Sequence, residues 1–218
     1  MLEQLPLGCS FLLCISLALS LSLVQNFGKL DNDEVPKDRM LKLHLGCGKR
    51  YFGKDWVHVD SRDFPHVVAK DILNLNYEDD SVDVIYASHV IEYFDRDEVV
   101  HLLHGWKRKM KDGGTLRLAV PDFEVLAKLY IENNAKLSNI IGPLYGKMRS
   151  GDVLIYHKTI YDFDSLSEVL FNVGFKNIRK YDWRHTEHAS FDDHSQAYLP
   201  HMDKENGTLI SLNVECDK

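Results

Sequence analysis

Two short runs, LKLHLGCG at residues 41–48 and WVHVD at residues 56–60, carry the most specific pattern in this sequence. Both are apolar stretches of strand length; the first leads directly into two glycines, and the second ends on Asp60. Paired glycines at a sharp turn let the backbone approach a ligand with no side chain in between. A carboxylate at a strand end can accept hydrogen bonds from both hydroxyls of a ribose. The two runs together predict a nucleoside-binding edge of a β-sheet.

Strand and helix patterns alternate along the rest of the chain. Further short apolar runs predict strands at 66–69, 82–87 and 115–120, and helical spacing appears at 95–110, 123–133 and 165–172. The last two alternating runs, 176–183 and 208–215, have no long helix between them, so they should form an antiparallel pair. The prediction is an α/β fold with a doubly wound, mainly parallel sheet and an antiparallel final strand.

In such a sheet, ligands bind at the carboxyl ends of the parallel strands. Asp71 and Ile72 follow the third predicted strand, where an acid can face an adenine amino group. The connection from Gly48 to Asp60 is short, so it should be a loop or a single turn rather than a full helix. That length argues against NAD, because a pyrophosphate needs a helix N-terminus at this place.

The order and spacing of these pieces resemble the class I S-adenosylmethionine-dependent methyltransferases. Within that class the sequence is most similar to methyltransferase type 11 and related small enzymes of glycan gene clusters. The resemblance covers residues 41 to about 218, and five stretches carry it: 43–48, 57–60, 70–72, 83–92 and 113–122. It implies a Rossmann-like fold and S-adenosylmethionine as the cofactor.

The resemblance also implies a set of cofactor-binding residues. Gly46, Cys47 and Gly48 would wrap the methionine part, and His44 stands where many relatives have an acid that contacts the cofactor's amino group. Asp60 would hold the ribose, Asp71 and Ile72 would border the adenine, and Ser88 and His89 would lie beside the sulfonium.

Methyl transfer needs alignment of the acceptor and, for a hydroxyl, a base. Histidine suits that role, and the candidates are His89, His157 and His194. Simpler alternatives are that His89 forms part of a pocket wall or begins a helix, and that His157 caps a helix or lies on the surface. The long connection 184–207 has no period of its own and is predicted to be a lid over the acceptor.

The same connection suggests a second interpretation of its polar residues. Imidazoles and carboxylates together suit a divalent ion, but the helical His-x-x-x-His spacing is missing, so no metal is predicted. The residues concerned are His185, His188, Asp192, Asp193, His194 and His201.

The function predicted is methyl transfer to a small-molecule or glycan acceptor, as in polysaccharide biosynthesis. No Asn-Pro-Pro-Tyr run follows the fourth strand, so the resemblance favours oxygen over planar amino nitrogen as the methylated atom. Two alternatives stay open: a non-catalytic protein that binds S-adenosylmethionine, and a nucleotide-sugar or NAD enzyme on a related sheet.

The net charge and the cysteine content indicate which kinds of partner and which cellular compartment to expect. A net charge of -7, with no Lys/Arg stripe among aromatics, argues against nucleic acid. The four cysteines show no zinc spacing, which fits reduced thiols in the cytoplasm.

The sequence divides at Met40 into an N-terminal segment, 1–39, and a methyltransferase domain, 40–218. Residues 5–24 carry no charge, and a polar linker follows them. Two interpretations remain: a membrane anchor, which would bring a lipid acceptor within reach, or an extension upstream of a natural start at Met40. Lys29, Lys37 and Arg39 would leave the rest of an anchored chain in the cytoplasm.

Overall fold

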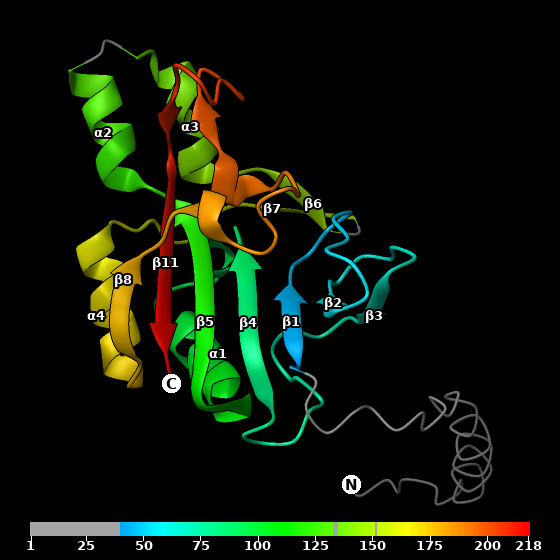
Figure 1. Cartoon of the computed structure of the whole chain (residues 1–218). Coiled ribbons are helices and arrows are strands. Elements are labelled where there is room, and N and C mark those ends of the chain that lie inside the picture. The colour runs from blue at the N-terminus through cyan, green and yellow to red at the C-terminus, as the bar shows by residue number, and fades with distance from the viewer. Residues whose placement is uncertain (1–39, 133–134, 151) are drawn as a thin grey trace, which may run out of the picture. The chain divides into compact units, whose positions relative to one another are not determined.

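A seven-stranded sheet forms the centre of the structure, a computed structural model that describes residues 40–132, 135–150 and 152–218 (Figure 1). The spatial order of its strands is β3-β2-β1-β4-β5-β11-β8. Their bounds are β1 Lys42–Leu45, β2 Trp56–Val59, β3 Val67–Ala69, β4 Val82–Ser88, β5 Met110–Pro121, β8 Lys176–Lys180 and β11 Ser211–Asp217. The apolar segment and polar linker of residues 1–39, for which the sequence leaves two interpretations, lie outside the described residues.

The sheet confirms the predicted doubly wound topology. β1 pairs in parallel with both β2 and β4, so the strand order reverses between β1 and β4. β11 pairs antiparallel with β5 on one side and with β8 on the other, as expected for the last strand. The place where the order reverses is where a ligand crevice is expected.

Alternation along the strands sends neighbouring residues to opposite faces of the sheet. On β1, Leu43 and Leu45 belong to the main hydrophobic core, and Ile85 and Ala87 of β4 join them. Buried residues of α1 Glu98–Lys109 and α4 Phe163–Val173 complete that core. The other face is covered by loop residues instead of helices, because the connection from β1 to β2 holds no helix, as its length predicted.

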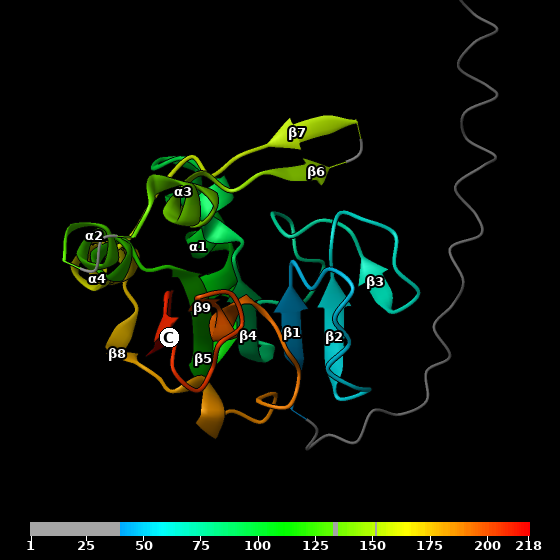
Figure 2. The ribbon, with the colours of Figure 1, turned by 90° about the horizontal axis from the view of Figure 1, so that it is seen from above.

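The helix predicted at 123–133 is present, but the further helix and the hairpin that follow it were not predicted. Between β5 and α4 the chain forms α2 Phe123–Ile131, α3 Leu137–Tyr145 and the hairpin of β6 Met148–Ser150 with β7 Val153–Ile155. Figure 1 shows α3 and this hairpin at the level of the strand ends, and Figure 2 shows them on the side of the sheet where α1 lies. The predicted lid contains two 3-10 turns, Trp183–His185 and His194–Gln196, and β9 Tyr198–Leu199, which pairs with β10 Thr208–Leu209.

The Trp106 side chain links the helical layer to the strand ends. It is fully buried in the main core, and its Nε1–H donates to the Ile72 carbonyl at 2.7 Å. Ile72 belongs to the loop after β3, so packing of α1 fixes a loop at the ligand-binding edge.

We predict that Trp106→Ala lowers the free energy of unfolding by about 3–5 kcal/mol, because it leaves a large cavity in the core. Urea denaturation followed by circular dichroism measures the change. Phe171→Ala on the exposed side of α4 is the control and should cost about 0.5 kcal/mol or less. Equal losses in the two variants would contradict this assignment of the core.

Candidate functional site

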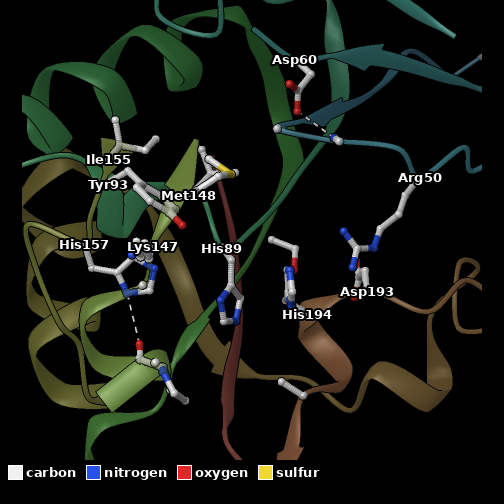
Figure 3. A pocket seen from close by; sticks show the side chains of 18 of the residues that line it. Arg50, Asp60, His89, Tyr93, Lys147, Met148, Ile155, His157, Asp193 and His194 are labelled. Atoms are coloured by element: carbon white, nitrogen blue, oxygen red, sulfur yellow. Dashed lines mark hydrogen bonds between the residues drawn. The ribbon is translucent and has the colours of Figure 1, made fainter. Parts of the chain in front are cut away.

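A cavity of about 970 Å³ lies over the carboxyl ends of β1, β2 and β4. This is the size range of small-molecule sites in proteins. The predicted residues that line it are Gly46, Gly48, Asp60, Asp71, Ile72, Ser88, His89, His157 and His194. Figure 3 shows its centre, with His89 between a wall that carries Asp60 and Arg50 and a wall that carries Ile155, Tyr93 and Met148.

The glycine turn after β1 is tied to the end of β2. The backbone N–H of Gly48 donates to Oδ2 of Asp60 at 2.7 Å. Gly46 has a φ of +66°, and a Cβ at this position would lie 2.3 Å from Cγ2 of Val90. Both the backbone conformation and the close approach therefore require glycine.

The Asp60 carboxylate is buried but keeps capacity for a ligand. Besides the bond from Gly48, its Oδ1 accepts from the backbone N–H of Arg62 at 2.9 Å and from Nε of Arg62 at 3.1 Å. A carboxylate accepts about four hydrogen bonds. The Arg62 side chain is 37% exposed, so it can turn away and release a further acceptor position for a ligand hydroxyl.

Asp71 shapes the loop that follows β3. Its side chain accepts from the backbone N–H groups of Leu73 and Asn74 at 2.8 and 3.1 Å, and from Nδ2 of Asn74 at 3.0 Å. The hydrogen bond from the Asn74 side chain is the main cause that lowers the pKa of Asp71. These bonds hold the loop so that Ile72 lines the cavity.

The structure corrects the expectation for His44, and it places the side chain of Cys47 outside the cavity lining. His44 lies between two core leucines and therefore points to the opposite face of the sheet, where its ring stacks on Phe52 at 4.0 Å. Burial is the main cause that lowers the pKa of His44 well below its usual value. The Cys47 side chain also stays out of the cavity lining, with its Sγ donating to the Gly48 carbonyl at 3.5 Å. Neither side chain meets the cavity.

A buried carboxyl group lies beside two of the candidate histidines. Glu92, in the 3-10 turn Ile91–Tyr93, is fully buried, and its Oε1 is 3.3 Å from Nδ1 of His89 and 3.8 Å from Nε2 of His157. Neither carboxyl oxygen has a hydrogen-bond partner among the described residues. Burial raises the pKa of Glu92 to about 8 and lowers the pKa of both histidines. At neutral pH the group holds a protonated Glu92 and neutral imidazoles.

The sequence pattern did not indicate Glu92 as a site residue, although Glu92 lies within the stretch 83–92 that carries the resemblance. Its backbone carbonyl accepts from the N–H groups of Lys158 and Thr159 at 2.8 and 3.2 Å, which brings His157 to the cavity from far along the chain. The Nδ1–H of His157 donates to the carbonyls of Pro143 and Leu144 at 3.1 and 3.3 Å (Figure 3). Because carbonyls only accept, Nε2 of His157 carries the lone pair.

The connection 184–207 contributes His194 to the cavity. Its ring centroid is 4.9 Å from that of His89. Its neighbour Asp193 is buried and accepts from the hydroxyl of Tyr86 on β4 and from the N–H of Ser195 at 2.9 Å. These bonds fasten the connection to the sheet next to His194.

The other polar residues of the connection 184–207 do not lie together. Asp192, Asp193 and His201 line the cavity, whereas His188 is buried on the opposite face, stacked on Phe52. Within the described ranges, no three His, Cys, Asp or Glu side chains are grouped so that they could hold a metal ion. Nor does any described helix have the length and apolar character needed to cross a membrane.

Part of this chain is similar to a known protein family. A family model described as a methyltransferase domain matches residues 49–118. A comparison with curated proteins gives no match.

Solved structures share the fold. An S-adenosylmethionine-dependent methyltransferase from Archaeoglobus fulgidus is 16% identical with a TM-score of 0.51, over 84% of this chain and 87% of that one. A second one, from Thermotoga maritima and described as a possible histamine N-methyltransferase, is 15% identical with a TM-score of 0.50, over 82% of each chain. These likenesses confirm the predicted Rossmann-like methyltransferase fold.

We predict that Glu92→Gln removes a pH-dependent loss of stability. The pKa of Glu92 is about 8 in the folded protein and near 4.5 when unfolded, so the native state holds a proton that the unfolded chain has lost between these values. The wild type should therefore lose stability relative to the variant as the pH rises from about 4.5 to 8, by at most about 1.4 kcal/mol per pH unit.

Urea denaturation at pH 5, 6.5 and 8 measures the difference. Glu98→Gln is the control, because Glu98 is exposed and the Lys158 side chain lowers its pKa, so this variant should not relieve the loss. Parallel stability curves for the wild type and Glu92→Gln would show that Glu92 ionises as an ordinary carboxyl group.

Proposed function

We propose that this chain, a class I S-adenosylmethionine-dependent methyltransferase, transfers the methyl group to a hydroxyl oxygen of a small-molecule or glycan acceptor. The domain responsible is assigned to residues 40–218. The observation that carries the proposal is the position of His89, at the end of β4, in the middle of the cavity and beside Glu92.

The cavity residues fit the cofactor. The glycine turn leaves room for backbone contact with the methionine part, Asp60 has acceptor capacity for a ribose hydroxyl, and Asp71 holds Ile72 at the place proposed for the adenine. The hydroxyl of Ser88 is buried without a partner among the described residues, so it is free to bond a ligand. When bound, S-adenosylmethionine supplies an electrophilic methyl group on a sulfonium.

His89 is proposed to take the proton from the acceptor hydroxyl. Burial keeps its imidazole neutral, so one ring nitrogen has a lone pair. If Nδ1 carries the proton toward Glu92, Nε2 is the basic atom, and that atom has no partner among the described residues. His157 and His194 are proposed to contact the acceptor from the two sides of His89.

The wall opposite Asp60 supports a small acceptor with an apolar part. Tyr93, Met148 and Ile155 line it, together with His157 and Lys147 (Figure 3). Apolar walls with a few fixed polar groups are typical of small-molecule sites. A hydroxyl needs a base when it attacks, which the histidines provide, so oxygen is the atom we propose. A cytoplasmic location is proposed because S-adenosylmethionine is made there.

We predict that Asp60→Ala abolishes binding of S-adenosylmethionine and S-adenosylhomocysteine, because the ribose loses its acceptor. We expect His89→Ala to keep cofactor affinity within about threefold and to slow methyl transfer by about a hundredfold or more. Isothermal titration measures the affinity. A labelled-methyl assay against cell extracts, with the product identified by mass, measures the transfer.

Asp63→Ala is the matched control, since its carboxylate is 87% exposed and pairs only with Lys70 among the described residues. It should change neither readout. Full cofactor affinity in Asp60→Ala would refute the ribose assignment, and unchanged transfer in His89→Ala would refute the base.

A further inference from the structure

Arg50 brings a positive charge into the cavity that no described carboxylate neutralises. Its Nε donates to the backbone carbonyl of Asp192 at 2.8 Å. Among the described residues, no Asp or Glu oxygen lies within 4.0 Å of its guanidinium, whereas the other arginine of the cavity, Arg62, pairs with Asp60. The nearby acids are already engaged: Asp192 with Nζ of Lys204 at 2.9 Å, and Asp193 with Tyr86 and Ser195.

The guanidinium lies between the glycine turn and the central histidines. Its Nη1 is 4.0 Å from the position that a Cβ on Gly48 would take. After burial and the neighbouring histidines, its charge contributes to the lowered pKa of His89, and it is the second cause after burial for His194. Figure 3 shows the Arg50 side chain reaching from the Asp60 wall toward Asp193 and His194.

We propose that Arg50 binds a carboxylate in the cavity, and that this carboxylate is the one on the methionine part of S-adenosylmethionine. The inference rests on the proposed function. With Nε occupied by Asp192, the two terminal amino groups of the guanidinium remain, and a planar carboxylate can bond to both. A carboxylate taken out of water into this cavity needs such a partner, because an unpaired buried charge is unfavourable.

The order of groups along the cofactor agrees with this placement. Its adenine and ribose are proposed at Ile72 and Asp60, and the carboxylate is at the opposite end of the molecule. The glycine turn, proposed to wrap the methionine part, ends two residues before Arg50. His44 points to the other face of the sheet, so it cannot contact this end of the cofactor. Arg50 is the charged residue of the β1–β2 connection that lines the cavity.

The same guanidinium contacts the connection 184–207 through Asp192. A carboxylate bound to Arg50 would therefore fix its side chain and, with it, the segment that carries His194. Cofactor binding would in this way help to order the wall that meets the acceptor.

The test compares two ligands that differ only in this group: S-adenosylmethionine and decarboxylated S-adenosylmethionine, each titrated calorimetrically against the full chain. We expect Arg50→Gln to lower the affinity for S-adenosylmethionine by about tenfold to a hundredfold, because a charge-assisted hydrogen bond is lost. The affinity for the decarboxylated ligand should fall by less than about threefold. The affinity of Arg50→Lys for S-adenosylmethionine should be intermediate, because lysine keeps the positive charge but lacks the planar guanidinium that makes two parallel hydrogen bonds to a carboxylate. Lys49→Gln, one residue away and outside the cavity lining, is the control and should bind both ligands as the wild type does.

Equal weakening of both ligands in Arg50→Gln would overturn the inference, since it would indicate a structural role. Unchanged affinity for S-adenosylmethionine would also overturn it and would leave a carboxylate of the acceptor as the partner of Arg50. A wild-type protein that binds neither ligand would contradict the proposed function itself.

Discussion

The hydrogen bond between the Gly48 N–H and the Asp60 carboxylate joins the two strand ends on which the site is built. It connects the turn after β1 to the end of β2 and is buried at both partners. The turn that makes this bond has a left-handed backbone at Gly46 and Gly48, which glycine adopts readily, and a side chain at Gly46 would also meet Val90. A short connection without a helix is sufficient here, since the turn is held by the carboxylate rather than by a helix N-terminus.

Alternation along the strands then decides which histidines meet the cavity. Leu43 and Leu45 occupy the core face of β1, so His44 between them must face the other side, where it packs with Phe52 and His188. The strand alternation does not apply to His89, because this residue follows β4 and has a φ of +53°. That conformation, uncommon outside glycine, turns the chain into the 3-10 turn with Glu92. The result is one buried acid shared by two imidazoles.

Local patterns in the sequence predicted the sheet, because every central strand and both core helices repeat apolar residues with a clear period. The glycine turn, Asp60 and the Asp71 loop were predicted for the same reason: each lies directly at a strand end. The position of His44 was predicted wrongly because a motif gives a residue's place along the strand but not the face of the sheet to which its side chain points. Glu92 was missed because its surroundings come from Lys158 and Thr159, which fold onto its carbonyl from far along the chain. The α3 helix and the β6–β7 hairpin were missed because α3 contains Pro143 and the hairpin strands have three residues each.

The α3 helix and the β6–β7 hairpin complete a cavity with two different walls. One wall is charged around Asp60 and Arg50, and the other is apolar around Tyr93 and Ile155. A crystal structure of the complex with S-adenosylhomocysteine would test this cofactor placement most directly. We expect ribose hydroxyls about 2.5–3.0 Å from the Asp60 carboxylate, with the Gly46–Gly48 backbone against the homocysteine. A ligand bound elsewhere, or an Asp60 side chain turned away from the ribose, would contradict it.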